Sequence, residues 1–430
     1  MAKIIVTSVA THAHFAPLVA IAADLTRRGH EVLFYTGARF EKQVLAAGAR
    51  LAPYPAEFDR DETDLIASYA GYEELNPFER MALHLKHLFF DPTPAHDKRL
   101  QELLADFPAT VVIGETASLG TLPMVLRSPR EERPLLIQIG ITPPTFESVD
   151  TAPFGPGMLP PTNDEERARY AEMRPQTRAM FSGIQQTAED AFRAAGVELP
   201  DFVFNAWATV PDHLLQLSVP SFEYPRSDAP ENFRFIGALP AWPGAGFDRP
   251  DWWAGLSDGR PVVVVTQGTV ANHDLSQLVV PTLRALADAD VTVVAATGRS
   301  DGPDLVRAAM GGDVPANVHL ADFVPFEQLL PLADVLVTNG GYGGVQAALR
   351  HGLPLVVGGE TEDKPEVAAR VEWSGTGVDL RTSSPEAAAV RAAVDQVLNE
   401  PGYRDRARAM QREMADHQPF DAIAELVEGA

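Results

Sequence analysis

The sequence contains no cysteine among its 430 residues. Disulfide bonds, cysteine nucleophiles and zinc sites built on thiolates are therefore excluded. A chain without disulfides is compatible with a reducing compartment, and we expect a cytoplasmic protein.

Positive charge is scarce as well. The chain has 35 Lys and Arg against 59 Asp and Glu, which gives a formal net charge of −24. A surface this acidic repels phosphate backbones and anionic lipid, so we expect no nucleic-acid partner and no membrane partner. The expected ligands are small molecules, and any phosphate they carry must be bound by local backbone dipoles. We expect a monomer or a homodimer.

Apolar runs long enough to span a bilayer are also missing. The N-terminal apolar stretch faintly imitates a secretory signal, because it has one early lysine and small residues near position 22. His12, His14 and Pro17 interrupt it. We interpret the stretch as a buried strand followed by a helix.

What the sequence does contain is a repeated alternation of strand and helix patterns. Residues 4–9 are apolar and β-branched, which predicts a buried strand. A loop is expected over 10–16, followed by a helix with Pro17 in its first turn. Residues 31–36 predict the next strand. The order strand–helix–strand predicts a parallel α/β sheet.

The same pattern restarts in the second half of the chain. Further strands are expected at 110–113, 135–139, 214–217, 262–266, 291–295, 318–320, 335–338 and 355–357. A segment rich in Pro, Gly, Asp and Trp, 220–258, is typical of a linker with one embedded strand at 233–236. We predict an α/β protein with two doubly wound, Rossmann-like domains, 1–219 and 259–430, that face each other across a cleft. Ligands bind such sheets at the carboxyl ends of the strands.

The most informative motif follows the strand at 335–338. Asn339 is followed by four glycines within five residues, Gly340, Gly341, Gly343 and Gly344, and then by a helical pattern. Glycines let the backbone approach a ligand, and a helix N-terminus binds phosphate. The dinucleotide fingerprint is not met, because Gln346 stands where the third glycine should fall, and the P-loop lysine is absent. The motif therefore predicts a phosphate cradle of another kind.

Two more strand ends carry polar or flexible residues. Gly268 and Thr269 follow the strand at 262–266, and their backbone and hydroxyl groups suit the same phosphates. Asp363 and Lys364 follow the strand at 355–357 and suit the hydroxyls of a sugar, although a solvated loop is the simpler interpretation of their charge.

Together with RGHEVLFYTG at 28–37, Phe323-Val324-Pro325 and HGLPLVVGG at 351–359, these segments resemble the inverting GT-B glycosyltransferases. That family includes bacterial macrolide and antibiotic glycosyltransferases and plant flavonoid glucosyltransferases. The resemblance covers nearly the whole chain through the order and spacing of the motifs. It implies that the N-terminal domain binds the acceptor, that the C-terminal domain binds a nucleotide sugar, and that the last helix packs back on the N-terminal domain.

Carried over by position, the resemblance implies a set of donor-binding residues. Phe323 stands where the family has a tryptophan that stacks on the base, and Val324 would offer its backbone to the base edge. The implied set is Gly268, Thr269, Phe323, Val324, Asn339, Gly340, Gly341, Gly343, Gly344, Gln346, Asp363 and Lys364.

The sequence departs from the family at several of these positions. Asn339 replaces a diphosphate-binding histidine, and Gly344 replaces a serine or threonine. Ala347 replaces the glutamate that holds the ribose. The amide of the neighbouring Gln346 is the candidate substitute for that glutamate. Lys364 replaces the amide of the acid–glutamine pair that grips the sugar. The base and the sugar are therefore left open, between UDP and dTDP and among the hexoses.

The resemblance also implies the catalytic residues. The family's base lies in the first βα loop, three residues before a proline, which is His14 here; His12 is the competing candidate in the same loop. A neutral histidine accepts the proton of an attacking hydroxyl. The supporting aspartate of the family falls on Glu115, which would stabilise the imidazolium.

No metal site is expected. Asp288-Ala-Asp290 imitates the Asp-x-Asp motif of metal-dependent sugar transferases. It lies at the amino end of a predicted strand, away from the ligand end, and is interpreted as a surface turn.

Candidates for acceptor contacts are apolar residues of the N-terminal half, namely Phe90, Phe146, Phe154 and Met158. The last three lie in a Pro- and Gly-rich segment that suits a lid.

The predicted function is an inverting, metal-independent hexosyl transfer from a UDP- or dTDP-sugar to a hydroxyl of a small, largely apolar natural product, with no cofactor beyond this co-substrate. Two alternatives stay open. One is a hydrolase or epimerase on the same scaffold; the other is a non-catalytic nucleotide-sugar-binding partner protein, motivated by Asn339 and Ala347.

Overall fold

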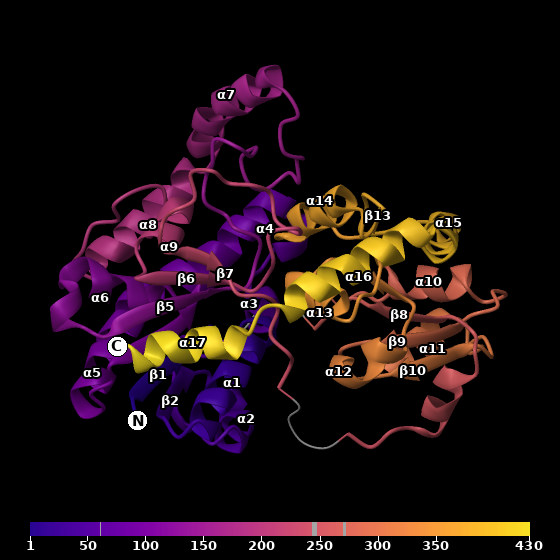
Figure 1. Cartoon of the computed structure of the whole chain (residues 1–430), viewed down its shortest axis with the longest axis horizontal. Coiled ribbons are helices and arrows are strands. Elements are labelled where there is room, and N and C mark those ends of the chain that lie inside the picture. The colour runs from indigo at the N-terminus through magenta and orange to yellow at the C-terminus, as the bar shows by residue number, and fades with distance from the viewer. Residues whose placement is uncertain (61, 243–246, 270–271) are drawn as a thin grey trace.

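The computed structural model describes residues 1–60, 62–242, 247–269 and 272–430. Within these residues the chain forms two parallel β-sheets, each covered by helices (Figure 1). The first sheet has the order β3-β2-β1-β4-β5-β6-β7 and the second the order β10-β9-β8-β11-β12-β13. Both are doubly wound, which confirms the predicted fold class. Part of the predicted linker, 243–246, lies outside the described residues.

The strands of the first sheet are β1 (Lys3–Thr7), β2 (Glu31–Thr36), β3 (Arg50–Pro53), β4 (Val111–Glu115), β5 (Leu135–Gly140), β6 (His213–Gln216) and β7 (Phe233–Phe235). Those of the second are β8 (Val262–Thr266), β9 (Thr292–Ala296), β10 (Val318–Ala321), β11 (Val335–Thr338), β12 (Leu355–Val357) and β13 (Gly377–Asp379). The central strands are buried on both faces, as their continuous β-branched sequences predict; Ile4, Ile5 and Val6 are fully buried.

The helices of the first half are α1 (His12–Arg27), α2 (Glu41–Ala46), α3 (Glu62–Ser68), α4 (Pro77–His84), α5 (Thr93–Asp106), α6 (Leu122–Arg127), α7 (Asp164–Met180), α8 (Ser182–Ala194) and α9 (Val203–Thr209). Those of the second are α10 (Val279–Ala285), α11 (Gly302–Ala309), α12 (Phe326–Leu329), α13 (Tyr342–Arg350), α14 (Lys364–Ser374), α15 (Ala387–Asn399), α16 (Pro401–Ala415) and α17 (Pro419–Glu428). Short 3₁₀ turns occur at η1 (Ala38–Phe40), η2 (Tyr72–Glu74), η4 (Leu119–Thr121), η5 (Arg130–Glu132), η6 (Asp251–Ser257) and η7 (Leu330–Leu332), and η3 (Leu85–Phe90) is a π-helix that continues α4. None of the helices in the described ranges is long and apolar enough to cross a membrane.

The last helix, α17, leaves the second half and packs on the first (Figure 1). Its buried Ile423 and Val427 join the core that α1 forms with the first sheet. Arg28, at the end of α1, donates a hydrogen bond to Asp421.

Three details of the secondary structure differ from the sequence-based expectation. The loop predicted over 10–16 was wrong beyond its first two residues, because α1 begins at His12 and contains Pro17 internally. Burial of Phe15 and Leu18 outweighs the one backbone hydrogen bond that a proline cannot donate. The edge strands β3 and β13 were not expected, and β7 pairs with β6 as part of the first sheet rather than standing alone in a linker.

Candidate functional site

The first part of the site lies at the carboxyl ends of β1 and β4, which are neighbours in the first sheet. The chain leaves β1 and enters α1, whose third residue is His14. β4 ends at Glu115. The Nδ1 atom of His14 lies 3.2 Å from Oε2 of Glu115. The structure therefore brings together the two residues predicted to act as base and supporting acid.

Glu115 is completely buried and firmly held. Its Oε1 accepts hydrogen bonds from the amide of Val9 at 3.2 Å and the hydroxyl of Ser118 at 2.8 Å, and its Oε2 accepts one from the amide of Ala117 at 2.6 Å. Burial by itself would raise the pKa of Glu115, but His14 and the two amides bring it below its usual value. A fixed carboxylate thus faces Nδ1 of His14 and directs Nε2 away from itself.

His12, the competing candidate, has different surroundings. It is the first residue of α1, its side chain is exposed, and it makes no hydrogen bond or ion pair with any residue in the described ranges. The His14 side chain is only 16% exposed and contacts a carboxylate. The geometry favours His14 over His12 as the base.

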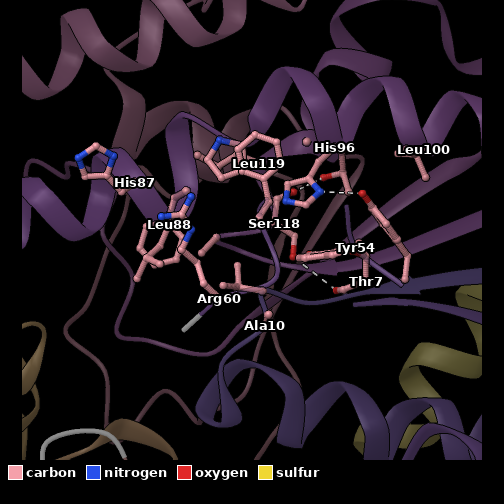
Figure 2. Close-up of a pocket in the computed structure, with 18 residues that line it drawn as sticks. Thr7, Ala10, Tyr54, Arg60, His87, Leu88, His96, Leu100, Ser118 and Leu119 are labelled. Carbon is pink, nitrogen blue, oxygen red and sulfur yellow. Dashed lines mark hydrogen bonds between the residues drawn. The ribbon is translucent and has the colours of Figure 1, made fainter. Parts of the chain in front are cut away.

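A pocket opens beside this pair of residues. Its lining comes from the sheet ends, η3, η4 and α5 (Figure 2). Its lining includes Val9, Phe89 and Ser118, and the ring of Phe89 lies 5.8 Å from that of His14. The pocket therefore begins next to the candidate base.

The four residues predicted for acceptor contacts lie elsewhere. Phe90 is fully buried in the core, and Phe146 packs edge-on against Phe233. Met158 lines a separate groove beside α14, and Phe154 does not line the pocket. The aromatic side chains that do line the pocket, and that the sequence analysis did not single out, are Tyr54, Phe58, Phe89 and His96. Only the side-chain directions given by η3 separate Phe89 from its neighbour Phe90.

The glycine motif lies at the carboxyl end of β11 in the second sheet. Gly341 is the N-cap of α13, so Gly343 and Gly344 form its first turn. A Cβ atom added to either glycine would meet nothing within 4 Å. The first backbone amide to bond within the helix is that of Val345, to the carbonyl of Gly341. The preceding amides of this turn are therefore available to an anion in open space.

Asn339 links this motif to the loop after β8. Its side chain is buried, and Nδ2 donates a 2.6 Å hydrogen bond to the carbonyl of Gln267. Gly268 has a φ of 73° and lies next to Asn339 Oδ1, while Thr269 is exposed. Asn339 therefore holds two ligand-side loops together, a role that its amide fills without a charge.

The loop after β12 packs on the same motif. A Cβ atom on Gly359 would lie 2.1 Å from the carbonyl oxygen of Asn339 and 2.8 Å from Cδ of Lys364, so only glycine fits. The ammonium group of Lys364 donates to the Thr361 hydroxyl at 3.1 Å and forms an ion pair with Glu362. Lys364 thus braces this loop.

Asp363 is the N-cap residue of α14 and interacts electrostatically with His14 of the first half. Burial raises its pKa to about 6, and His14 is among the charges that oppose this rise. The candidate base of one half and a carboxylate of the other half are therefore within electrostatic reach of each other.

The remaining residues predicted to bind the donor differ in their exposure. The ring of Phe323 is 54% exposed after β10 and is free of packing that would prevent stacking, whereas Val324 is buried. Gln346 is buried and donates to the hydroxyl of Ser218 in the first half. Its side chain is thus used between the two halves rather than presented to the cleft.

A buried polar network fixes the two halves to each other. Arg370 of α14 donates to Glu223 at 2.7 Å and to Glu366 at 2.8 Å. Burial would lower the pKa of Arg370, but the two carboxylates raise it well above its usual value. Glu223 also accepts a 2.6 Å hydrogen bond from Tyr342, the first residue of α13. Glu366 also accepts hydrogen bonds from the backbone amides of Gly155 and Gly157. The glycine motif is therefore anchored directly against the first half.

Comparison with known proteins agrees with this geometry. The chain is 38% identical over 99% of its length to UDP-glycosyltransferase 2 of Phaeomoniella chlamydospora, of which the match covers 95%. It is 37% identical over its whole length to 4'-demethylrebeccamycin synthase of Lentzea aerocolonigenes, of which 99% is covered. The chain belongs to the GT-B glycosyltransferases.

Further comparisons support the fold of this glycosyltransferase. Residues 280–428 match the family described as "Erythromycin biosynthesis protein CIII-like, C-terminal domain". The crystal structure of CalG4, the calicheamicin glycosyltransferase, superposes with a TM-score of 0.72 at 23% identity and covers 100% of this chain and 98% of its own. Spinosyn rhamnosyltransferase SpnG, solved with spinosyn aglycone, superposes with a TM-score of 0.68 at 19% identity over the full length of both chains. The two sheets of this glycosyltransferase are thus those of the GT-B fold.

Proposed function

We propose that this glycosyltransferase moves a hexose from a UDP- or dTDP-sugar onto a hydroxyl of a small, largely apolar acceptor, with inversion at the anomeric carbon and without a metal ion. The observation that carries the proposal is the contact between His14 and the buried Glu115 beside an apolar pocket, opposite Asp363 and the open first turn of α13.

The proposed reaction is a single displacement. Nε2 of His14 accepts the proton of the acceptor hydroxyl while the hydroxyl oxygen attacks the anomeric carbon. The bond from that carbon to the diphosphate oxygen breaks, and the nucleoside diphosphate leaves with the electron pair. Attack opposite the leaving group inverts the configuration. Glu115 stabilises the imidazolium that forms on His14.

The first turn of α13 supports departure of the diphosphate. Free amides and the positive end of the helix dipole at Gly343 and Gly344 stabilise the charge that develops on the leaving group. Phe323 offers a ring face for the base, and Asp363 offers a carboxylate to the sugar hydroxyls.

The proposal is tested by incubating the protein with a panel of UDP- and dTDP-hexoses and hydroxylated aromatic and macrolide acceptors, with mass spectrometry of the products. We expect acceptor masses increased by one hexosyl group, in the presence of EDTA as in its absence. Release of free sugar regardless of acceptor would instead identify a hydrolase. Nucleotide-sugar binding without any turnover would identify a binding protein. Activity lost to EDTA and restored by magnesium or manganese would contradict metal independence.

A further inference from the structure

The pocket beside His14 contains a second histidine for which the proposed reaction has no use. His96 is the fourth residue of α5 and lines the same pocket as Phe89 (Figure 2). Its ring packs against Tyr54, with centroids 4.1 Å apart, and against Tyr35 and Phe58. The imidazole is partly buried in this aromatic wall, so its polar nitrogens lose part of their hydration.

The position of His96 is fixed by its backbone. A Cβ atom added to Gly120 would lie 2.5 Å from Cβ of His96 and 3.2 Å from the amide nitrogen of Asp97. α5 therefore packs directly on η4 at this point, which fixes the Cα and Cβ atoms of His96 beside the pocket.

The charge state of His96 is also defined. Burial lowers its pKa to about 3, so the ring is neutral at physiological pH. Its place in the first turns of α5, near the positive end of the helix dipole, acts in the same direction. A neutral imidazole carries one N–H group and one acceptor nitrogen, and its partners decide which is which.

Tyr35 determines which ring nitrogen of His96 carries the proton. Its hydroxyl lies 2.7 Å from Nδ1 of His96. Burial raises the pKa of Tyr35 far above its usual value, so the hydroxyl keeps its proton. This buried hydroxyl has no other hydrogen-bond partner among the residues the structure describes, so we assign Tyr35 as the donor to Nδ1. The proton of the imidazole is then on Nε2, on the side of the ring away from Tyr35.

The neighbouring hydroxyl groups of the pocket already donate hydrogen bonds within the protein. Ser118 donates to Glu115, Thr121 donates to the carbonyl of Ser118, and Tyr54 donates to the carbonyl of Ser8. In contrast, Nε2 of His96 has no hydrogen-bond partner in the described part of the chain. Because His96 lines the pocket, a ligand bound there can supply the acceptor for this N–H group.

We infer that His96 is a specificity-determining residue whose Nε2–H group binds a carbonyl oxygen of the acceptor molecule, at a point separate from the hydroxyl that His14 deprotonates. The inference rests on the proposed function for the identity of the ligand as a sugar acceptor. It narrows the substrate class to apolar molecules that carry both a hydroxyl and a hydrogen-bond-accepting oxygen. Tyr35 is a positioning residue, since it acts only through the tautomer of His96.

Two pairs of ligands isolate the carbonyl group. 4-Hydroxyacetophenone and 4-ethylphenol differ by a carbonyl against a methylene, as do 7-hydroxyflavone and its analogue with a methylene at that position. Affinity is measured by calorimetry with no donor sugar present, so that catalysis does not enter. We expect the wild-type protein to prefer the carbonyl member of at least one pair by roughly 10-fold, the value of one well-made hydrogen bond. Equal affinity within both pairs would overturn the inference.

Matched variants identify the responsible donor. His96→Phe and Tyr35→Phe should remove most of the preference. The first deletes the donor, and the second removes the hydrogen bond to Nδ1 that keeps the imidazole proton on Nε2. His87→Phe and Tyr54→Phe are the same substitutions in the same pocket and should retain it. Loss of the preference in the controls, or its retention in His96→Phe, would contradict the assignment.

A ligand-free measurement covers the case in which His96→Phe does not fold. In protein labelled with ¹⁵N-histidine, the Nε2–H tautomer gives distinct nitrogen shifts for the two ring positions. We expect His96 to remain neutral with its proton on Nε2 from pH 8 to pH 5, and Tyr35→Phe to alter this signal. A protonated ring or an Nδ1–H tautomer would overturn the inference. Failure of sugar transfer with this signal intact would instead contradict only the proposed function.

Discussion

The two halves of the molecule place different chemical groups at their proposed ligand sites. In the second half the main groups are backbone amides, released by Gly343 and Gly344 at the start of α13. In the first half they are side chains, above all His14, Glu115 and the aromatic wall of the pocket. Under the proposed function, backbone amides bind the diphosphate that UDP- and dTDP-sugars share, whereas side chains contact the acceptor. We therefore expect selectivity among acceptors to lie in the first half.

The largest expected effect comes from changing the candidate base in the first half, where side chains form the proposed site. His14→Ala should lower kcat by about 100- to 10,000-fold on an alcohol acceptor, the range for a positioned general base. Affinity for the donor should hardly change, because the other half holds it. Steady-state kinetics with calorimetry of the donor separates the two quantities.

The control is His12→Ala, which removes an exposed imidazole from the same helix turn. Its effect should be mild. The His14→Ala defect should also shrink on phenols, which ionise more readily than alcohols. Equal defects at the two histidines would show that the base is wrongly assigned.

The second effect tests the backbone half. Gly343→Val introduces a side chain into the open space in front of the first turn of α13, where helical backbone tolerates it. Binding of UDP and dTDP should fall by about 100-fold or more, since the crowded site cannot accept the diphosphate. Calorimetry measures the loss.

Gly402→Val is the matched control, because Gly402 is also the second residue of a helix and also faces open space. It should leave nucleotide affinity unchanged. Full nucleotide affinity in Gly343→Val would mean that the diphosphate binds elsewhere.

A smaller effect concerns the one side chain of the second half proposed to contact the base. Phe323→Ala should weaken nucleotide binding by about 1–3 kcal/mol if the exposed ring stacks on the base. Leu305→Ala, at another exposed apolar side chain of the same half, should have no effect. A loss of nucleotide-binding free energy well below 1 kcal/mol in Phe323→Ala would mean that the ring does not stack on the base.

The smallest effect is a pH dependence at Asp363. Because burial raises its pKa to about 6, the carboxylate is ionised above that pH and accepts hydrogen bonds from sugar hydroxyls. Donor affinity should therefore fall as the pH decreases through 6, by at most about tenfold per pH unit. The affinity of the intact nucleotide sugar, measured between pH 5 and 8, should lose this inflection in Asp363→Asn. An unchanged inflection in the variant would assign it to another group.

The same division explains what could be predicted from the sequence. Strands such as β8 and β11 and the glycine motif at 339–344 are visible because buried strands and glycine runs have local sequence signatures. Asn339 was predicted as a phosphate ligand, and its use as a link to Gln267 depends on a contact between segments 72 residues apart. Local sequence carries no signature of such a contact.

The pocket wall was harder to predict than the donor loops. Phe90 was a predicted acceptor contact, yet it lies in the core, while its neighbour Phe89 faces the pocket. The two residues differ only in their direction from the π-helical turn η3, which the sequence does not signal. His96 has no local signature either, because Tyr35, on β2, determines its chemistry.

The central claim, inverting transfer that uses both halves of the cleft, is tested most directly by the configuration of the product. The wild-type protein is incubated with the α-linked UDP- or dTDP-hexose that gives turnover, and the anomeric proton of the product is followed by NMR from the first turnovers. The account predicts a β-linked glycoside whose formation requires both donor and acceptor. An α-linked product, or free sugar released without acceptor, would contradict it.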